Sequence, residues 1–284
     1  MKKSPKIILN GELIAESEAK VSPLNRGMMY GDGCFETLRA YAGQFLRWEA
    51  HYARLEAGMN YLGMNLPFDS AGLKSKISEL LRENQLFVSD AMVRLQCWRE
   101  GGRGYAPDSR QSSWMVQVSE ANKMYPPSKL ITAKTRCIPS EALERRYKLS
   151  NGLNYIKATQ EAQQVEADDA LMLTMQDKIS ETTSANIFWV KDGTLFTPDV
   201  SCDLLPGVTR KMVLDVAEKL GIPLETGAFG LMSVQNAEAM FCTNSLVEIR
   251  EVSSLDGIEF TPQHMMVKEI KAGFEQLKEE ELQA

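Results

Sequence analysis

Apolar and polar residues alternate in patterns that divide the first part of the chain into short strands and helices. Two apolar runs flank Asn10-Gly11, and this dipeptide between such runs predicts a β-hairpin. A further strand is expected over 34–41. Apolar residues then recur at helical spacing in 49–64 and again in 70–85, which predicts two helices.

Two strands and a proline-containing segment follow these helices. Alternation over 90–100 and 112–120 predicts the strands, which a loop rich in glycine and arginine connects. The segment 120–127 contains two prolines and shows no period, so it is the expected linker. We therefore expect an N-terminal domain over 1–119 and a C-terminal domain over 128–284.

The second half of the chain continues the mixture of strands and helices. Its clearest helix spans 206–223, where apolar residues share one face and Gly221 and Pro223 end the pattern. This order of elements predicts an α+β protein. The other expected elements are strands over 130–137, 169–175 and 237–244, a strand pair over 186–198 joined by a hairpin turn at 191–193, and helices over 151–165 and 266–283.

The composition is that of an ordinary globular protein and narrows the choice of partners. Hydrophobic residues make up 44% of the 284 residues and charged residues 25%. The net charge of −6 argues against nucleic-acid binding, which requires a basic surface. No apolar run reaches the length of a membrane span, so we expect a cytoplasmic protein that binds neither nucleic acid nor membrane.

The cysteines and histidines restrict the chemistry that the chain can perform. The five cysteines are scattered without a CxxC pair, and the two histidines, His51 and His264, belong to no HExxH motif. We therefore expect neither a disulfide framework nor a metal site. An enzymatic reaction would depend on lysine, carboxylate, tyrosine or an organic cofactor.

Two lysines in the segment 145–164 are candidates for such chemistry. Lys157 lies off the apolar stripe of the helix expected there, in the position of a solvated surface residue. Lys148 precedes that helix beside Tyr147 and Leu149, where partial desolvation would favour a nucleophilic amine. Because most lysines at such positions are exposed, the residues alone leave the choice open.

Three polar segments further along have both a chemical and an ordinary structural interpretation. Glu181 lies at the end of a strand, where its carboxylate could pair with a buried cation. Gly207, Val208 and Thr209 begin a helix whose first amides suit a phosphate, although a capping threonine alone accounts for the sequence. The segment Cys242–Ser245 offers hydroxyl and amide donors, or forms a simple polar turn.

These residues belong to a longer pattern. In order, the chain contains Glu181, Asn186-Ile187-Phe188, Leu195-Phe196-Thr197 and Leu205-Pro206-Gly207-Val208-Thr209-Arg210. The pattern resembles the signature of the class IV aminotransferases, which are pyridoxal-phosphate enzymes of fold type IV. The resemblance extends to YGDGCFETLR and HYARL near the N-terminus and so covers most of the chain.

The resemblance implies a fold and a quaternary structure. It implies a smaller N-terminal α/β domain and a larger C-terminal β-barrel-like domain. The expected fold is therefore an α+β, two-domain fold of the D-amino acid aminotransferase type. A homodimer is also implied, because the family forms its active site between subunits.

The resemblance also assigns the residues that bind the implied cofactor, pyridoxal 5'-phosphate. The family's Schiff-base lysine precedes a helix and lies about thirty residues before the glutamate, which favours Lys148 over Lys157 as the catalytic residue. Glu181 is expected to pair with the pyridine nitrogen. The residue that contacts the ring hydroxyl stays open, since Leu153 stands near the usual tyrosine position and Tyr155 slightly further on. The phosphate is expected to be bound by Arg54, Val208, Thr209 and Asn244 or Ser245.

The loop after the strand over 90–100 favours one reaction of this family. Its GGRGY string resembles the aminodeoxychorismate lyase branch, as does YGDGCF. Thr37 replaces a glycine common in the branched-chain enzymes, and the loop lacks the histidine expected of the D-amino-acid enzymes. We therefore expect a lyase that eliminates pyruvate to release 4-aminobenzoate for folate synthesis, with transamination of branched-chain L-amino acids or D-amino acids as the alternative. The expected substrate contacts are Tyr30, Phe35, Arg99, Arg103 and Tyr105.

Overall fold

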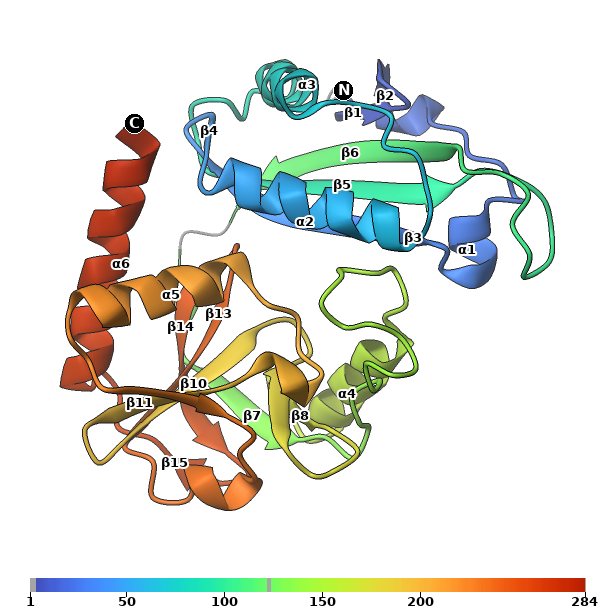
Figure 1. Ribbon diagram of the computed structural model, residues 1–284. Coiled ribbons are helices and arrows are strands. Elements are labelled where there is room, and N and C mark those ends of the chain that lie inside the picture. The colour runs from blue at the N-terminus through green and yellow to red at the C-terminus, as the bar shows by residue number, and fades with distance from the viewer. Residues whose placement is uncertain (1–3, 122–123, 284) are drawn as a thin grey trace. The chain divides into compact units, whose positions relative to one another are not determined.

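The computed structural model describes residues 4–121 and 124–283, and the chain forms two compact units (Figure 1). Part of the expected linker, residues 122–123, lies outside the described residues. One short segment belongs to the first unit although the chain on both sides of it belongs to the second. The first unit comprises Met1–Lys123 and Tyr147–Asn151, and the second comprises Met124–Arg146 and Gly152–Ala284.

The first unit is built on a six-stranded antiparallel sheet in the order β2-β1-β6-β5-β3-β4. Asn10 and Gly11 connect β1 to β2 with φ of 51° and 89°, and a positive φ at both turn positions belongs to the tight hairpin that the sequence predicted. The strands are β1 (Lys6–Leu9), β2 (Glu12–Ala15), β3 (Gly33–Tyr41), β4 (Gln44–Phe45), β5 (Ala91–Arg99) and β6 (Ser112–Glu120).

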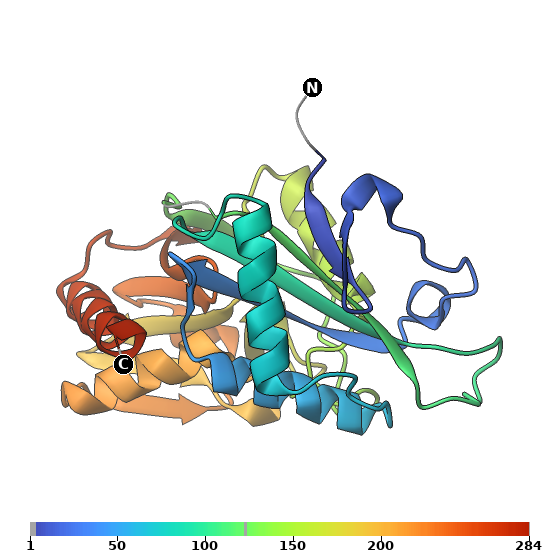
Figure 2. The same ribbon diagram turned by 90° about the horizontal axis from the view of Figure 1, so that it is seen from above.

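Two helices pack against this sheet in the places that the helical spacing predicted. α2 (Trp48–Tyr61) contacts β3, whereas α3 (Ser70–Glu83) contacts β1 and β6 and lies across the strands in Figure 2. The Asp69 side chain caps α3 by accepting a hydrogen bond from the Gly72 amide at 2.7 Å. The shorter helices are η1 (Glu16–Glu18) and α1 (Arg26–Tyr30).

The second unit contains a nine-stranded sheet in the order β12-β11-β10-β13-β14-β7-β8-β9, with β15 paired to β14. The pairs β11–β12, β14–β7 and β7–β8 are parallel. Because β9 also contacts β10 in the middle of the order, the sheet is strongly curled. The strands are β7 (Ser128–Thr132), β8 (Asp169–Leu173), β9 (Ile179–Thr182), β10 (Asn186–Lys191), β11 (Thr194–Pro198), β12 (Leu224–Gly227), β13 (Ala239–Asn244), β14 (Glu248–Leu255) and β15 (Ile258–Glu259).

The helices of the second unit pack against this sheet and against each other. α4 (Leu153–Gln164) contacts β8, and α5 (Val208–Lys219) contacts both β13 and α6 (Met265–Gln283). The amphipathic pattern expected of α5 is confirmed by its buried face, which includes Met212, Val213, Val216 and Ala217. Two short 3-10 helices complete the unit, η2 (Val200–Cys202) and η3 (Leu231–Val234).

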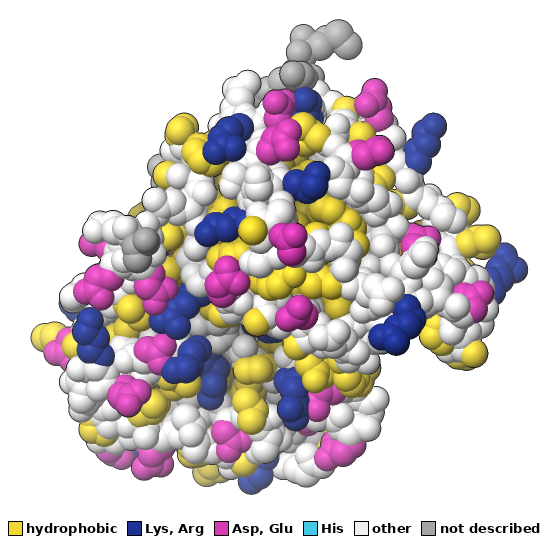
Figure 3. Space-filling view, turned by 45° about the horizontal axis from the view of Figure 1, so that its top comes forward, with side chains coloured by type: hydrophobic (Ala, Val, Ile, Leu, Met, Phe, Trp, Pro, Cys, Tyr) yellow, Lys and Arg dark blue, Asp and Glu magenta, His cyan; other side chains and the backbone are white. Residues whose placement is uncertain are grey.

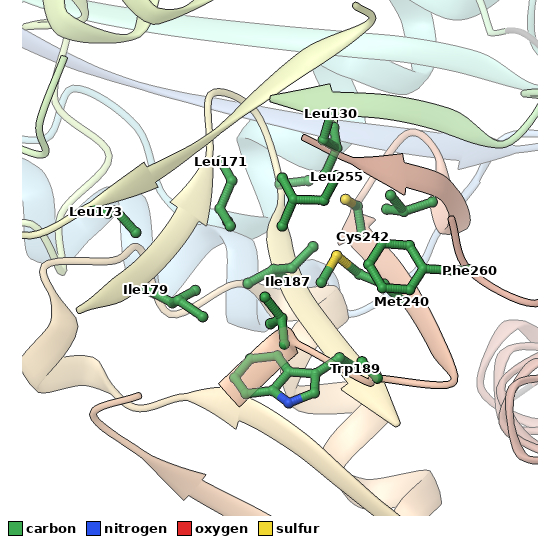
Figure 4. Close-up of a cluster of buried hydrophobic side chains, with 14 residues drawn as sticks. Leu130, Leu171, Leu173, Ile179, Ile187, Trp189, Met240, Cys242, Leu255 and Phe260 are labelled. Carbon is green, nitrogen blue, oxygen red and sulfur yellow. The ribbon is translucent and has the colours of Figure 1, made fainter. Parts of the chain in front are cut away.

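Hydrophobic side chains from several strands of the curled sheet meet in one buried cluster (Figure 4). Trp189 stacks on Phe196 with 5.7 Å between ring centroids, and Phe229 meets Trp189 edge-on at 5.2 Å. Ile187 points to the same side of β10 as Trp189, because side chains alternate along a strand. Phe188 faces the other side and is also fully buried, so β10 is covered on both faces.

The surface mixes charges of both signs. On the face that Figure 3 shows, Lys and Arg side chains are interspersed with Asp and Glu. Within the described residues, no group of three or more His, Cys, Asp or Glu side chains is arranged to hold a metal ion. None of the helices in the described part of the chain combines the length and the apolar character that a bilayer span requires.

Truncation of Ile187 is expected to destabilise the second unit, since its side chain is fully buried. We expect Ile187→Ala to lower the free energy of unfolding by about 2–5 kcal/mol and Ile187→Val by about 1 kcal/mol. Val200→Ala, at a side chain that is 60% exposed, is the control and should cost less than about 0.5 kcal/mol. Urea unfolding measures all three, and equal losses for Ile187→Ala and the control would contradict this core.

Candidate functional site

Lys148 lies on a short segment that pairs with the start of β3. The Phe35 amide donates to the Lys148 carbonyl, and the Ser150 amide donates to the Gly33 carbonyl, both at 2.9 Å. Backbone hydrogen bonds at Lys148 itself and at Ser150, two residues later, therefore hold the backbone from which the Lys148 side chain extends. A functional side chain that starts from such a fixed position can be held in a narrow range of geometries.

Two cationic side chains lie close to the ring of Phe35. The Lys148 Nζ lies 4.7 Å from the ring centroid, and the Arg94 Cζ lies 4.2 Å from the same centroid. Arg94 also donates to the Thr37 hydroxyl at 3.3 Å. Arg94 is half-buried, and burial lowers the pKa of its guanidinium.

Arg94 was not among the residues predicted from the sequence. Its position on β5 is directly opposite Thr37 on β3, so its closeness to Phe35 follows from the register of two strands. The alternating pattern of the segment 90–100 predicts the strand but not its partner. An arginine in the middle of a half-buried strand is the signal that could have identified it.

Lys157 occupies the surface position predicted for it. It is exposed on α4, and its Nζ donates to the Gln160 side chain at 3.0 Å. A hydrated ammonium group of this kind is a poor nucleophile. Lys148, half-buried and fixed by its backbone, is the stronger candidate for chemistry.

Arg54 and Glu36 form a buried ion pair in the first unit. Nε and Nη2 of Arg54 donate to Oε1 and Oε2 of Glu36 at 2.6 and 2.8 Å, and His51 Nδ1 lies 2.9 Å from Oε2. Burial opposes ionisation of Glu36, but Arg54 and His51 outweigh it and hold the pKa of the carboxyl well below its usual value. Arg54, the residue expected at the phosphate, is thus oriented by a carboxylate.

A second buried charge cluster holds the loop that contains GGRGY. Asp32 Oδ2 accepts hydrogen bonds from Nε of Arg26 at 2.8 Å and from Nε of Arg99 at 2.9 Å. Arg26 also donates to two carbonyls of the loop at 2.8 Å, and Arg99 donates to the Ser109 carbonyl at 2.9 Å. Arg99, predicted to contact substrate, is 5% exposed and bonded to the loop and to Asp32.

The tip of the same loop presents two other predicted residues to solvent. Arg103 is exposed, and Tyr105 is 91% exposed. The ring centroid of Tyr105 lies 5.6 Å from that of Tyr30, whose hydroxyl accepts a hydrogen bond from the Gly104 amide at 2.9 Å. The fold thus brings Tyr30 and Tyr105 together, with Arg103 nearby in the loop.

In the second unit, Glu181 is buried among hydrogen-bond donors. The Tyr155 hydroxyl donates to Oε1 at 2.7 Å, while the Leu205 amide and the Asn186 side-chain amide donate to Oε2 at 3.1 and 3.3 Å. A buried carboxylate requires such donors to replace its lost hydration. The widely spaced signature residues Glu181, Asn186 and Leu205 are therefore neighbours in the folded chain.

The first turn of α5 begins beside Asn186. A Cβ on Gly207 would lie 2.2 Å from Asn186 Oδ1, so a larger residue does not fit there. Val208 is half-buried and Thr209 is buried. Because first-turn amides lack partners within their own helix and carry the positive end of its dipole, this turn suits an anionic group.

Asn244 holds the turn that follows β13. Its Oδ1 accepts hydrogen bonds from the Leu246 and Val247 amides at 2.9 Å, and its Nδ2 donates to the Ser184 carbonyl at 3.1 Å. Asn244 therefore shapes the turn on which Ser245 lies.

Arg145 is a further residue that the sequence did not single out. It is 5% exposed, and its Nη2 donates to the Tyr155 hydroxyl. Burial and then the charge of Glu181 raise the pKa of Tyr155 well above its usual value, so Tyr155 is a neutral donor. The pair Arg145-Arg146 offered no sequence signal for which arginine is buried.

The sequence profile of the family described as amino-transferase class IV matches residues 33–255. The match extends from the start of β3 to the end of β14, well over half of the chain. The chain belongs to the class IV aminotransferase family. The resemblance inferred from the signature is confirmed.

Relatives of this class IV aminotransferase carry different names. A protein of Methanocaldococcus jannaschii named "Putative branched-chain-amino-acid aminotransferase" is 33% identical over 89% of this chain and 88% of its own. A D-alanine aminotransferase of Bacillus licheniformis is 29% identical over 89% of each chain. An aminodeoxychorismate lyase of Vibrio harveyi is 30% identical over 83% of this chain and 87% of its own.

Solved structures confirm the predicted fold. A branched-chain aminotransferase of Thermoproteus uzoniensis, solved with norvaline, has a TM-score of 0.88 and 28% identity over 95% of this chain and 93% of its own. The branched-chain enzyme of Thermobaculum terrenum, solved in its PLP form, has a TM-score of 0.88 and 23% identity over 98% of this chain and 95% of its own. The two-domain α+β fold with a curled sheet is therefore that of fold type IV.

The ion pair of Glu36 predicts a pH-dependent stability. Because the folded state lowers the pKa of Glu36 from an ordinary value of 4.5, the stabilisation is complete above about pH 4.5 and decreases as the pH falls further. Glu36→Gln is expected to cost about 3 kcal/mol at pH 7, since it removes the buried carboxylate charge that pairs with the half-buried Arg54 guanidinium.

Urea unfolding between pH 7 and pH 3 measures this effect. The difference between the unchanged protein and Glu36→Gln should shrink as the pH falls below about 4.5. Glu83→Gln is the control, because Glu83 pairs with Lys6 at the surface and should contribute less than about 1 kcal/mol. A Glu36→Gln difference that stays constant over this range would argue against the ion pair.

Proposed function

We propose that this protein is an aminodeoxychorismate lyase, which eliminates pyruvate and releases 4-aminobenzoate. Pyridoxal 5'-phosphate is the cofactor of this enzyme, as expected of its family. The observation that carries the proposal is the set of cationic and phenolic groups in the first unit, on Phe35 and on the GGRGY loop. Aminodeoxychorismate carries two carboxylates, and guanidinium groups are well suited to bind them.

The described residues fit the cofactor. The first turn of α5 suits its phosphate, and the buried carboxylate of Glu181 suits a protonated ring nitrogen. In addition, the Arg145 guanidinium and the Thr243 hydroxyl have buried polar atoms without a partner among the described residues. Buried polar atoms of this kind require an explanation, and a bound ligand with acceptor atoms provides one.

When bound, the cofactor supplies an electron sink for the carbon next to the substrate nitrogen. Lys148 is proposed to bind the cofactor and, once the substrate amine has released it, to move a proton. Its Nζ would take the proton from that carbon, the C–O bond to the enolpyruvyl group on the neighbouring carbon would break, and Nζ would return the proton to the departing enolpyruvate, which becomes pyruvate. The backbone bonds to β3 hold Lys148 for both steps.

Glu181 is proposed to keep the ring nitrogen protonated, the state in which the ring accepts electrons best. Leu205 and Asn186 fix its Oε2, and Tyr155 donates to its Oε1. Its carboxylate charge would complement the protonated ring nitrogen.

We propose that a guanidinium and the amides at the start of α5 together bind the phosphate. Arg54 would supply the charge, and its hydrogen bonds to Glu36 set the direction of the guanidinium. The remaining contacts would come from Val208, Thr209 and Ser245. Asn244 would act through the turn that it holds rather than by contact.

The substrate carboxylates are proposed to meet Arg94, Arg103 and Tyr105, beside Tyr30 and Phe35. Arg94 has a guanidinium that stacks on Phe35 and bonds to a neutral hydroxyl, so a carboxylate partner would be favourable. Arg99 is assigned a different role. Because its donors serve Asp32, the Ser109 carbonyl of the loop and two carbonyls at the end of α2, we propose that it positions the loop.

A transaminase is the alternative function. The relatives named as branched-chain and D-alanine aminotransferases support it, with identities close to that of the lyase relative. A homodimer in the cytoplasm remains part of the proposal. An exposed aromatic such as Tyr105, on a loop held by buried ion pairs, is a suitable group for a partner subunit to contact.

Replacement of the two lysines tests the catalytic assignment. Lys148→Ala is expected to abolish the yellow absorbance of the purified holoenzyme and to lower its activity by at least ~10²–10⁴-fold, because the cofactor loses its covalent anchor and the reaction its proton carrier. Lys157→Ala is the matched control and should keep both. A yellow, active Lys148→Ala protein would exclude Lys148 as the catalytic lysine.

Absorbance of the yellow protein distinguishes the two reactions. L-leucine, L-glutamate and D-alanine are added one at a time without a keto acid, followed in a separate sample by aminodeoxychorismate. The lyase predicts no bleaching with the three amino acids and release of 4-aminobenzoate from aminodeoxychorismate. Bleaching with one donor and no 4-aminobenzoate would instead identify a transaminase and its stereochemistry.

A further inference from the structure

Arg145 is buried in the second unit with more donors than acceptors around it. Its Nη2 donates to the Tyr155 hydroxyl, and its Cζ lies 5.2 Å from the Tyr155 ring centroid. Nε and Nη1 are buried and have no hydrogen-bond partner among residues 4–121 and 124–283. The neighbouring Arg146 is exposed and pairs with Glu144 at 3.2 Å.

Such an arrangement is costly for folding alone. A buried N–H without a partner loses its hydration and receives nothing in return, and the penalty is larger for a charged group. An apolar side chain of similar length would fill the same space at no such cost. The guanidinium is therefore better explained by a ligand whose acceptor atoms meet Nε or Nη1.

Tyr155 is not available to donate to that ligand. A tyrosine hydroxyl has a single proton, and this one points to Glu181 Oε1 at 2.7 Å, while the oxygen accepts from Arg145. The chain of hydrogen bonds thus runs from Arg145 through Tyr155 to Glu181. Arg145 is the member of the chain that still has N–H groups to offer.

The other titratable groups near Arg145 do not compete for these donors. Burial, and next the charge of Glu181, raise the pKa of the Cys137 thiol to about 12, so this thiol is neutral. Asp203 accepts a hydrogen bond from the Ser140 amide at 2.8 Å. Glu181 is reached through Tyr155 rather than directly.

We propose that Arg145 donates a hydrogen bond from Nε or Nη1 to the ring oxygen of the bound pyridoxal phosphate. The inference rests on the proposed pairing of Glu181 with the ring nitrogen. In the cofactor, one ring carbon separates that nitrogen from the carbon that bears the oxygen. Arg145 is linked to Glu181 through Tyr155, so its guanidinium is a suitable donor for this oxygen. A guanidinium stabilises the anionic form of such an oxygen strongly.

The pH dependence of the yellow absorbance tests this contact without measuring activity. A cation beside the ring oxygen disfavours protonation of the bound cofactor, so Arg145→Met is expected to raise the midpoint of the absorbance change by roughly one to three pH units. Arg145→Lys keeps the charge and should shift it less. Arg146→Met is the matched control and should leave the midpoint unchanged.

Tyr155→Phe tests whether Arg145 contacts the ring oxygen directly or acts on it through the Tyr155 hydroxyl. If Arg145 meets the ring oxygen itself, Tyr155→Phe should shift the midpoint less than Arg145→Met. Equal shifts would overturn the proposal, as would an unshifted Arg145→Met with a raised KM, which would assign Arg145 to a substrate carboxylate. A colourless unchanged protein would refute the proposed function, whereas a yellow one with unshifted Arg145 variants refutes only this contact.

Thermal unfolding provides a second readout in the same variants. Arg145→Met without cofactor should be as stable as the unchanged protein or more so, because a buried charge with unused donors is removed. The increase in Tm on addition of pyridoxal phosphate should be smaller for Arg145→Met than for the unchanged protein. An Arg145→Met protein that loses stability without cofactor and keeps the full gain would mean that Arg145 serves folding only.

Discussion

Two backbone hydrogen bonds, between residues 33–35 and 148–150, hold the backbone from which the candidate catalytic lysine extends. They attach a short segment to the first unit although the chain on both sides belongs to the second. A lysine in an unattached loop samples many positions, whereas chemistry requires a narrow range of distances. The pairing removes that freedom and brings Lys148 to the ring that it shares with Arg94.

Buried carboxylates organise the polar groups of each unit. Glu36 orients Arg54, the half-buried Asp32 accepts hydrogen bonds from Arg26 and Arg99, and Glu181 accepts hydrogen bonds from three segments. Well-packed apolar residues would provide similar stability, so buried charges of this kind are weak evidence for stability alone. Arg145 differs from the arginines in these ion pairs, because two of its buried nitrogen atoms, Nε and Nη1, have no acceptor among the described residues.

Elements that depend on residues close together in the chain were predicted well, whereas some strands that depend on pairing with distant segments were not. α2, α3 and α5 follow from helical periodicity, and the hairpin of β1 and β2 follows from its turn residues. The strand expected over 130–137 is shorter, since β7 ends at Thr132. Strands β12 and β14 were not predicted. β12 pairs only in parallel with β11, and β14 lies between its sequence neighbour β13 and the distant strand β7.

The sequence by itself determined the family and the α+β class. The preference for Lys148 over Lys157 and the role of Glu181 are implied by the resemblance to the family and stay predictions. These follow from residue types at fixed spacings, which a linear pattern contains. Only the tertiary structure decided which side chains meet, namely Arg94 with Phe35, Arg99 with Asp32, and Arg145 with Tyr155. Each of these contacts depends on strand register or on burial, and both are settled by packing between segments that are distant along the chain.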